Sequence, residues 1–437
     1  MKTVNTIFAL SSAYGKAGVS VFRISGPASY DILSILSHGK KFQPNMMKFA
    51  NIYHPKTDVL LDSCMAVFFK GPASYTGEDT VELYTHGSIA VIDSIYEALS
   101  QFKDARLAEN GEFTKQAFLN NKLDLTQVEG IADLIEAETE SQRKLALSNT
   151  NGEASKLYNS WRERLVKILA WCEASIDFSD DEMPKDVVQK NDNDLKKLIS
   201  EIEKHIETAS SAQLIKQGLK VAIIGKPNVG KSSIFNKIIG ENKAIVSNIA
   251  GTTRDIVDAS LDINGFKVNI SDTAGLNEKT NDKIEKKGIK KALDTAAKAD
   301  IKIYMIDGIR SLDEKKIDDD TIVLFNKIDK KQIENLPKYI IPISVKSGEN
   351  WNKFWSIFVK KIKSKMSNSS DATLTQQRYK NALNNCIEFL KIAIKESEID
   401  LKAENLRLAC NEIGNITGKI YFNELLDKIF SSFCLGK

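Results

Sequence analysis

The chain reads Gly225-Lys-Pro-Asn-Val-Gly-Lys-Ser232, and this stretch predicts a phosphate-binding loop. It fits the pattern G-x-x-x-x-G-K-[ST], in which glycines let the backbone curl so that N–H groups point at a phosphate. An apolar run, residues 221–224, precedes the loop, and apolar side chains at helical spacing follow it. Strand, loop and helix therefore come in the required order. We expect Lys231 to reach the terminal phosphates of a nucleotide and Ser232 to bind Mg²⁺.

A second motif indicates which base the nucleotide carries. Residues 322–329 read Ile-Val-Leu-Phe-Asn-Lys-Ile-Asp, a buried-strand pattern that ends in Asn326-Lys327-Ile328-Asp329. An Asp carboxylate only accepts hydrogen bonds, and it has two oxygens. It can accept from both the ring N–H and the exocyclic amine of guanine, an edge that adenine lacks. The sequence therefore predicts GTP rather than ATP.

Three further motifs fall in the order that a GTP site needs. Gly251-Thr-Thr-Arg-Asp255 supplies a Thr for Mg²⁺, Asp272-Thr-Ala-Gly275 follows a strand pattern, and Ser344-Val-Lys346 would close over the base. Any one of these motifs alone could be an ordinary polar loop. Together with the phosphate loop and the Asn-Lys-x-Asp motif they make five motifs in the order of a GTP site within the length of one domain, which chance does not explain. The predicted GTP-binding residues are Asn228, Val229, Gly230, Lys231, Ser232, Ser233, Ser247, Asn248, Ile249, Ala250, Gly251, Thr252, Thr253, Asp272, Thr273, Ala274, Gly275, Asn326, Lys327, Asp329, Ser344, Val345 and Lys346.

One position departs from Ras-like proteins, where a Gln after the Asp-x-x-Gly motif orients the attacking water. Here that position is Leu276, which neither donates nor accepts a hydrogen bond. Hydrolysis then needs another source of positive charge, and the side-chain carbonyl of Asn228 can bind a monovalent cation beside the phosphates. Glu285 is the candidate for orienting the water; the alternative is a solvated helix charge.

Composition excludes several classes of protein. A length of 437 residues predicts about three domains. The 61 basic and 58 acidic residues are nearly balanced, and no long basic tail indicates nucleic-acid binding. The five cysteines are far apart and lack zinc-site spacing, which is typical of reduced cysteines in a cytosolic protein. The apolar run at residues 7–10 is too short for a signal peptide, and nowhere do about 18 apolar residues run together, so we expect no membrane span.

Hydrophobic periodicity predicts a multidomain α/β and α protein. Residues 1–118 alternate strand patterns with turns and one helix, an α+β domain. Residues 119–216 and 364–437 have apolar side chains at three- and four-residue steps, the pattern of helices. We expect residues 217–363 to form a Ras-like P-loop GTPase domain inserted into a discontinuous helical domain. His205 falls beside an apolar helical stripe and is expected to be a flanking histidine, not a ligand.

Segments outside the five nucleotide motifs indicate which family of GTPases the chain resembles. They are Val19-Ser-Val-Phe-Arg-Ile-Ser-Gly26, Ser74-Tyr-Thr-Gly-Glu-Asp79, Val81-Glu-Leu-Tyr-Thr-His-Gly87, Gly111-Glu-Phe-Thr-Lys-Gln-Ala-Phe-Leu-Asn-Asn-Lys-Leu-Asp-Leu125 and the terminal Phe433-Cys-Leu-Gly-Lys437. With them, the chain resembles the MnmE (TrmE) family of tRNA modification GTPases over nearly its whole length.

The resemblance implies a cytoplasmic homodimer that hydrolyses GTP with Mg²⁺ and K⁺. It implies action on carbon 5 of the wobble uridine of certain tRNAs, to install a carboxymethylaminomethyl- or aminomethyl-type group. An FAD-dependent partner of the MnmG type would join it in a heterotetramer. The N-terminal domain would mediate dimerisation and bind 5-formyl- or 5,10-methylene-tetrahydrofolate as one-carbon donor.

The resemblance also implies roles for particular residues. The folate-binding residues would be Arg23, Glu82, Lys122 and Lys437; the K⁺ ligands Asn228, Ser247, Ile249 and Thr252; the Mg²⁺ ligands Ser232 and Thr253; and the catalytic residues Glu285, Arg254 and Cys434. Counting back from Gly288 gives Glu285 as the acidic residue, whereas counting forward from Asp272 gives Ile284, so a one-residue insertion is expected. Val345 stands where the family more often has Ala, and Ser247 where it more often has Thr. The contact expected of each residue is made by its backbone, so neither difference affects the prediction. Cys434 is either a packed small hydrophobe or a reactive thiol.

The alternative class is an RNA-binding, ribosome-assembly GTPase switch of the Era or Der type. Such proteins share the nucleotide motifs but carry a KH-like module or a second GTPase domain. This chain has one phosphate loop, and no Gly-x-x-Gly loop in a KH-like context. Binding of a tetrahydrofolate would discriminate the two classes.

Overall fold

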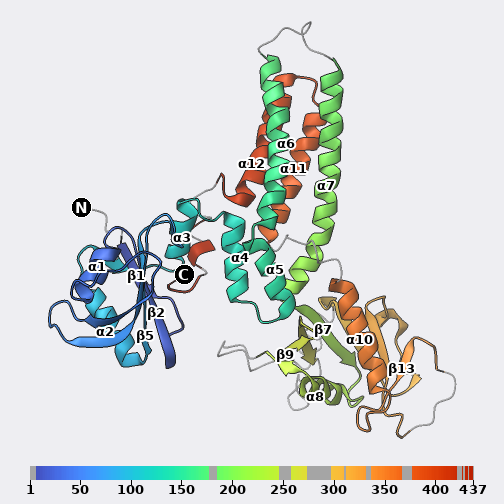
Figure 1. Cartoon of the computed structure of the whole chain (residues 1–437). Coiled ribbons are helices and arrows are strands. Elements are labelled where there is room, and N and C mark those ends of the chain that lie inside the picture. The colour runs from blue at the N-terminus through green and yellow to red at the C-terminus, as the bar shows by residue number, and fades with distance from the viewer. Residues whose placement is uncertain are drawn as a thin grey trace, which may run out of the picture. The chain divides into compact units, whose positions relative to one another are not determined.

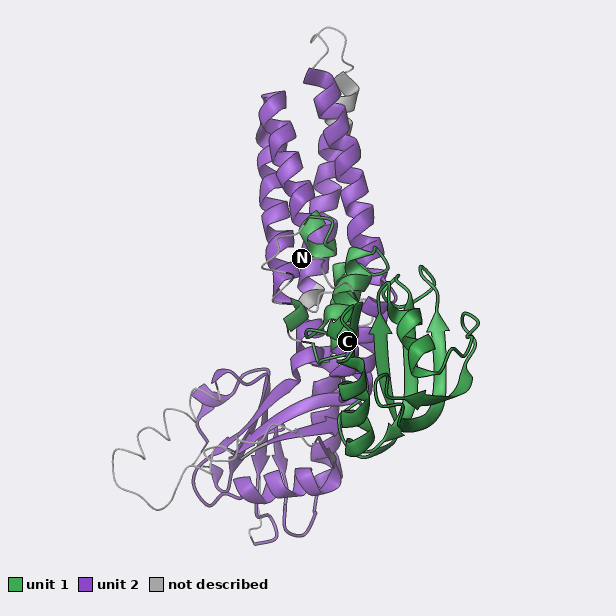
Figure 2. Cartoon of the chain, turned by 90° about the vertical axis from the view of Figure 1, so that its left-hand side faces the viewer, with its two compact units in different colours: residues 1–132, 414–437 green, residues 133–413 purple. Residues whose placement is uncertain are grey.

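The computed structural model of this chain describes residues 6–176, 185–245, 257–272, 297–309, 312–330, 336–366, 376–420, 426, 429–431 and 433–436. The chain divides into two compact units (Figure 2). Unit 1 comprises residues 1–132 and 414–437, and unit 2 comprises residues 133–413. The domain limits expected at residues 118, 216 and 363 differ from the limits of these two units, and they stay predictions.

Unit 1 is built on a six-stranded sheet with the order β3-β4-β5-β2-β1-β6. All neighbouring pairs are antiparallel except β1 and β6, which are parallel. Its elements are β1 (Thr6–Leu10), β2 (Ala17–Ser25), α1 (Ser29–Leu36), β3 (Lys48–Tyr53), β4 (Leu60–Phe69), β5 (Thr80–Gly87), α2 (Ile89–Leu99), β6 (Ala105–Leu107), α3 (Glu112–Leu119) and the first part of α4 (Leu125–Ile135). This is the α+β architecture that the sequence predicts.

Alternation along β2 and β5 separates the two faces of this sheet. Phe22 and Ile24 are fully buried in one core with residues of α1 and α2, because successive side chains of a strand point to opposite faces. Arg23 and Ser25 therefore lie on the other face, which carries a smaller cluster that includes Phe113 of α3. Polar side chains on a covered face need partners, and this face is where the second candidate site lies.

The end of the chain packs within unit 1. Leu426, Phe430 and Phe433 share a hydrophobic cluster with Phe118 and residues at the start of α4. The carbonyl of Gly436 accepts a hydrogen bond of 3.0 Å from the Ser11 hydroxyl. Gly436 has a φ of +91°, and a Cβ there would collide with the backbone oxygen of Leu10, so only glycine fits. Cys434 is exposed, whereas the other four cysteines are buried, and all five are free.

Unit 2 contains a helical part made from two distant stretches of sequence (Figure 1). Its helices are α5 (Glu140–Thr150), α6 (Glu153–Ile176), α7 (Lys185–Gln217), α11 (Gln377–Lys395) and α12 (Ile399–Thr417) as far as residue 413. Ion pairs join the two stretches: Lys391 of α11 to Glu203 of α7 at 2.7 Å, and Arg407 of α12 to Glu173 of α6 at 2.9 Å. The predicted discontinuous helical region is therefore confirmed.

His205 is more enclosed than a flanking histidine. It is half-buried, and its ring meets the rings of Tyr158 and Trp161 edge-on. Its Nε2 lies 3.2 Å from the Tyr158 hydroxyl. Burial lowers its pKa to about 4, so the ring is neutral at physiological pH.

The rest of unit 2 is a seven-stranded sheet with the order β13-β12-β11-β7-β10-β9-β8. The strands from β13 to β10 run parallel, while β9 pairs antiparallel with both of its neighbours. The elements are β7 (Leu219–Gly225), α8 (Lys231–Glu241), β8 (Lys243–Ala244), β9 (Val257–Ile263), β10 (Phe266–Asp272), β11 (Ile301–Ile306), β12 (Thr321–Phe325), β13 (Ile340–Pro342) and α10 (Trp351–Met366), with a 3₁₀ turn at Glu314–Lys316.

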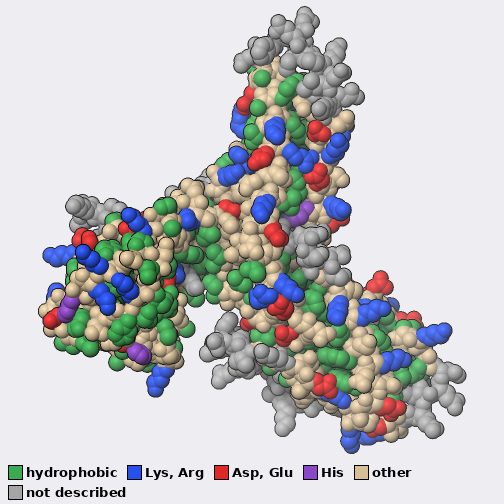
Figure 3. All heavy atoms as spheres, viewed as in Figure 1, with side chains coloured by type: hydrophobic (Ala, Val, Ile, Leu, Met, Phe, Trp, Pro, Cys, Tyr) green, Lys and Arg blue, Asp and Glu red, His purple; other side chains and the backbone are tan. Residues whose placement is uncertain are grey.

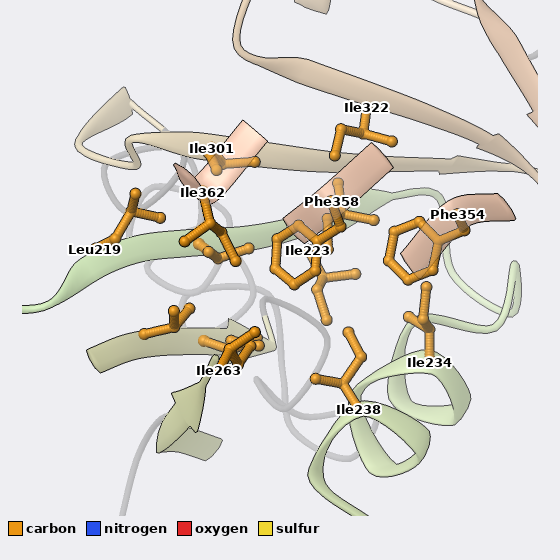
Figure 4. Packing of buried hydrophobic residues seen from close by; sticks show 14 of the residues in the cluster. Leu219, Ile223, Ile234, Ile238, Ile263, Ile301, Ile322, Phe354, Phe358 and Ile362 are labelled. Atoms are coloured by element: carbon orange, nitrogen blue, oxygen red, sulfur yellow. The ribbon is translucent and has the colours of Figure 1, made fainter. Parts of the chain in front are cut away.

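A buried apolar core holds this sheet between its helices. Figure 4 shows Ile223 of β7 directed at Ile234 and Ile238 of α8, with Phe354 and Phe358 of α10 closing the same cluster. All five side chains are fully buried. The core leaves the carboxyl ends of β7, β10, β11 and β12 at one edge of the sheet, where ligands bind in open α/β sheets.

Candidate functional site

The phosphate loop has the expected local structure. β7 ends at Gly225 and α8 begins at Lys231. Gly225, Asn228 and Gly230 all have positive φ (147°, 62° and 106°), which lets the loop curl tightly. A Cβ at Gly230 would run into the side chain of Asn326, and one at Gly225 would meet the carbonyl of Met305. The two glycines are therefore required by close packing as well as by φ.

Lys231 is buried, with 7% of its surface exposed, and its ammonium group lies over the loop. It donates to the carbonyls of Gly225 at 3.0 Å and Lys226 at 2.9 Å. Burial lowers its pKa, and the charge of Asp272 opposes that effect. A cation held against the loop backbone is placed to meet phosphate oxygens.

The side chain of Ser232, which the sequence predicts as an Mg²⁺ ligand, meets that of Asp272. The Ser232 hydroxyl donates to Asp272 Oδ2 at 2.8 Å, and Asp272 is only 3% exposed. Strands β10 and β7 are parallel, so their carboxyl ends lie together and deliver both side chains to one place. Hydroxyl and carboxylate oxygens suit Mg²⁺. Among the described residues no group of three or more His, Cys, Asp or Glu forms a separate metal cluster.

The base-recognition segments are tied directly to the phosphate loop through Asn326. Its Nδ2 donates to the Val229 carbonyl at 2.7 Å, and its Oδ1 accepts from the Val345 amide at 3.2 Å. Asn326 is 4% exposed, so both hydrogen bonds are shielded from water. Three motifs that are separated in sequence thus form one assembly.

Lys327 and Asp329 complete this assembly. Lys327 Nζ donates to the Asn228 carbonyl at 2.6 Å and lies 3.3 Å from Asp307. Asp329 Oδ1 accepts from the Ser344 hydroxyl at 2.8 Å. That contact orients the carboxylate expected to read guanine.

Several predicted residues lie outside the described part of the chain. They are Ser247, Asn248, Ile249, Ala250, Gly251, Thr252, Thr253, Arg254, Thr273, Ala274, Gly275, Glu285 and Lys437. Leu276 also lies outside the described part. The assignments of K⁺ ligands, of Thr253 to Mg²⁺ and of Glu285 to the water therefore stay predictions. The role expected for Cys434 also stays a prediction.

The second candidate site lies on the far face of the sheet in unit 1. Arg23 and Glu82 stand opposite each other on β2 and β5, and Arg23 Nε donates to Glu82 Oε1 at 3.0 Å. Both side chains are largely buried, with 15% and 13% exposed. Lys122 donates to the Pro72 carbonyl at 2.9 Å, on the loop between β4 and β5. The structure therefore brings Arg23 and Glu82 together, and it places Lys122 against that loop.

Sequence reasoning missed residues in both sites. Tyr84 donates to Glu82 Oε2 at 2.7 Å, and the Arg23 guanidinium lies over the rings of Tyr75 and Phe113. The two-residue period of β5 puts Tyr84 on the face of Glu82, so that one was derivable. Asp307 follows β11 and lies beside Lys327, and its place directly after an apolar strand was the available signal.

The surface charges are mixed (Figure 3), as the near balance of basic and acidic residues predicts. On the face seen in Figure 3, Lys and Arg side chains are interspersed with Asp and Glu. Within the described ranges, no helix combines the length and the apolarity that crossing a membrane requires.

Two family models match successive parts of the chain. The family model described as the MnmE helical domain matches residues 125–434, and the model described as the GTP-binding protein TrmE N-terminus matches residues 6–122. A solved structure of the G domain of the Thermotoga maritima FeoB iron transporter is 24% identical, with a TM-score of 0.24; the match covers 33% of this chain and 98% of that one.

Curated relatives match end to end. A protein of Rickettsia canadensis (strain McKiel) is 43% identical over 449 residues, covering 99% of this chain and 100% of the relative. One from Rickettsia rickettsii (strain Sheila Smith) is 45% identical over 450 residues, with the same coverage. Both are named tRNA modification GTPase MnmE. Because the family models and these relatives together span nearly the whole sequence, the chain belongs to the MnmE family.

Proposed function

We propose that this chain hydrolyses GTP to drive modification of carbon 5 of the wobble uridine of certain tRNAs. The product would carry a carboxymethylaminomethyl- or aminomethyl-type group. The carbon would come from 5-formyl- or 5,10-methylene-tetrahydrofolate, and an FAD-dependent partner of the MnmG type would act with the chain. The phosphate of GTP does not enter this product, so hydrolysis serves to change conformation.

The observation that carries the GTPase part is the buried side chain of Asn326. It joins the phosphate loop at Val229 to the Ser344-Val-Lys346 segment at Val345. Phosphate recognition and guanine recognition are thereby parts of one rigid site. The relatives named tRNA modification GTPase support extending this activity to tRNA.

We propose Mg²⁺ and K⁺ as the resident ions of this site. Ser232 and Thr253 would hold Mg²⁺, with Asp272 beside Ser232 at hydrogen-bond distance. Asn228, Ser247, Ile249 and Thr252 would hold K⁺, whose charge would replace an arginine finger. Asn228 has φ 62° and is exposed in the loop, which leaves its side chain accessible. Equal GTP hydrolysis rates in K⁺ and Na⁺ buffers would contradict the K⁺ proposal.

The folate proposal depends on the Arg23–Glu82 pair. Tetrahydrofolates present an aminopyrimidine edge with N–H donors, and they present carboxylates on the glutamate tail. A carboxylate and a guanidinium on one covered sheet face suit those two kinds of group. Lys122 and Lys437 would add cations. The cytoplasmic homodimer, and its heterotetramer with the FAD-dependent partner, are proposed from the family resemblance alone.

The whole proposal is tested in a strain from which this gene is deleted. Wobble uridines of its tRNAs are analysed by mass spectrometry of nucleosides after complementation. We expect the wild-type chain to restore the modified nucleoside and Lys231→Ala to fail, although it is expressed equally. Unmodified tRNA in the complemented strain would overturn the proposal. The Era or Der alternative is not proposed, because the family matches cover the N-terminal and helical parts as well as the nucleotide motifs.

A further inference from the structure

The Arg23 guanidinium is fixed in place from several sides. Its Nε donates to Glu82 Oε1 at 3.0 Å. Its Cζ lies 5.0 Å from the centroid of the Tyr75 ring and 5.5 Å from that of Phe113. Both distances are within the range at which a guanidinium is attracted to the face of an aromatic ring. The planar group therefore has little freedom to rotate.

The residues that hold Arg23 are themselves held. The Tyr84 hydroxyl donates to Glu82 Oε2 at 2.7 Å, so both carboxylate oxygens of Glu82 have a donor. The Tyr75 hydroxyl lies 2.9 Å from the Thr114 hydroxyl, and Phe113 is fully buried. Burial, together with Glu82, raises the pKa of Tyr84 to about 12, which keeps its phenol a donor at all physiological pH values.

The terminal amino groups of Arg23 are not used by this network. Within the part of the chain that the structure describes, the only hydrogen bond of this guanidinium runs from Nε to Glu82. Arg106, in contrast, spends both terminal nitrogens on Glu112. An arginine anchored through Nε presents its two terminal nitrogens as a fork that matches a planar pair of oxygens or a carbonyl.

We propose that Tyr84, Tyr75 and Phe113 are positioning residues that hold Arg23 with its fork directed at a planar oxygen acceptor of the ligand. The inference rests on the proposed folate donor and deepens it. On tetrahydrofolates the acceptor is either a glutamyl carboxylate or the carbonyl of the pteridine ring. Preorganisation of the fork lowers the entropy that binding must overcome.

Three variants separate positioning from folding. Tyr75→Phe keeps the ring and removes only the hydroxyl, whereas Tyr75→Leu removes the ring. We expect the Kd for 5-formyl-tetrahydrofolate, measured by titration of the full chain, to change less than about 2-fold for Tyr75→Phe. It should rise about 5-fold for Tyr75→Leu. Tyr84→Phe should raise it about 10-fold, because a hydrogen bond to a charged group is lost. A purely structural role would move the thermal midpoint of unit 1 and leave Kd unchanged.

A fragment distinguishes the two acceptors. 6-Methyltetrahydropterin has the ring carbonyl but no carboxylate. If Arg23→Lys weakens its binding, the fork takes the carbonyl. If Arg23→Lys weakens only 5-formyl-tetrahydrofolate, the fork takes a carboxylate. If neither ligand is affected, the inference is wrong.

Chemical modification tests the fork without relying on folate affinity. 2,3-Butanedione reacts with the terminal nitrogens of arginine, and peptide mass spectrometry locates the product. We expect Arg23 to react in the free chain and to be protected by 5-formyl-tetrahydrofolate, while Arg106 is unaffected by that ligand. If the wild type binds no 5-formyl-tetrahydrofolate, the proposed donor is wrong. The reagent then decides the inference alone, since an unreactive Arg23 would overturn it. Binding that is unchanged in Tyr75→Leu and Tyr84→Phe would overturn the inference and leave the donor standing.

Discussion

Asp329 is the side chain that we propose selects the base. Its Oδ1 accepts from the buried Ser344 hydroxyl, so the carboxylate is oriented before a nucleotide arrives. Both of its oxygens are acceptors, which matches the two N–H donors of guanine. The phosphate contacts expected of Lys231 and the loop would be the same for any nucleoside triphosphate. We therefore expect discrimination between bases to depend on this carboxylate.

We predict that Asp329→Asn changes the preferred nucleotide from GTP to XTP. Asn offers one acceptor and one donor group, and xanthine replaces the exocyclic amine of guanine by an oxygen acceptor. GTP affinity should fall by at least about 100-fold, because the amide nitrogen of Asn would face an N–H donor of guanine and leave it without an acceptor. Competition of GTP and XTP for a fluorescent nucleotide measures the change. Asp307→Asn, beside Lys327, is the matched control and should retain GTP preference. Retained GTP preference in Asp329→Asn would mean that the base lies elsewhere.

His205 makes the stability of unit 2 depend on pH. Burial lowers its folded pKa to about 4, below the value of about 6.5 for an unfolded histidine. The unfolded chain therefore binds more protons between these values, and stability is lost as pH falls through that window.

We predict that His205 costs unit 2 about 2 kcal/mol of unfolding free energy between pH 7 and pH 5. All four tryptophans, Trp161, Trp171, Trp351 and Trp355, lie in unit 2, so their fluorescence during denaturant titration reports on it. His205→Phe should flatten the pH dependence by that amount, whereas the exposed-residue control His38→Gln in unit 1 should not. Equal slopes for wild type and His205→Phe would show that His205 is not the group responsible.

At the scale of elements, helix α5 is joined to its surroundings through Gln142. Its Oε1 accepts from the backbone N–H of Glu138 at 2.9 Å and of Thr139 at 3.1 Å, at the start of the helix. Its Nε2 donates 3.0 Å to the Lys216 carbonyl at the end of α7. Nearby, the Ser141 amide donates to the Gly265 carbonyl in the turn between β9 and β10, and Glu138 pairs with Lys267. One side chain therefore caps a helix and links it to another.

We predict that Gln142→Ala lowers the unfolding free energy of unit 2 by about 1–2 kcal/mol, since a cap is lost and a carbonyl loses its donor. Gln142→Glu keeps the acceptor for the cap but not the donor to Lys216, so its effect should be intermediate. Tryptophan-detected denaturation measures both. Lys144→Ala, on the exposed surface of the same helix, serves as control. If Gln142→Ala matches that control, the link carries no stability.

Local elements followed from the sequence more readily than their pairing. The apolar run before the phosphate loop predicted β7, and the alternation at residues 19–24 predicted β2, because periodicity expresses which side of an element is buried. That β2 pairs with β5, placing Arg23 opposite a Glu 59 residues away, depends on sheet topology. Nothing local to Arg23 encodes that partner.

At the scale of the whole molecule, the two candidate sites belong to different compact units. The GTP site is formed by residues of unit 2, and the Arg23–Glu82 site by residues of unit 1. In the described part of the chain, the two sites have no side chain in common. When two sites share no residues, a change in one has little effect on ligand affinity at the other, unless a conformational change couples them.

We predict that Lys231→Ala abolishes GTP hydrolysis but leaves the Kd of 5-formyl-tetrahydrofolate within about 2-fold of wild type. The reciprocal variant, Arg23→Ala, should lose the folate and keep the GTP Kd within the same limit. Ligand titrations of the full chain measure all four values. A tenfold effect on the opposite ligand would reveal coupling of at least about 1.4 kcal/mol between the units.

The sequence by itself determined the nucleotide chemistry, the presence of an α+β and a helical part, and the family resemblance. It did so because phosphate loops, strand ends and helix stripes are local patterns whose spacing follows from backbone geometry. Only the tertiary structure decided that Asn326 joins Val229 to Val345, that His205 is half-buried, and that Arg23 meets Glu82, Tyr75 and Phe113. These contacts join residues that are distant along the chain or belong to different elements. They exist only after the sheets and helices have packed, because burial and partnership are properties of that packing.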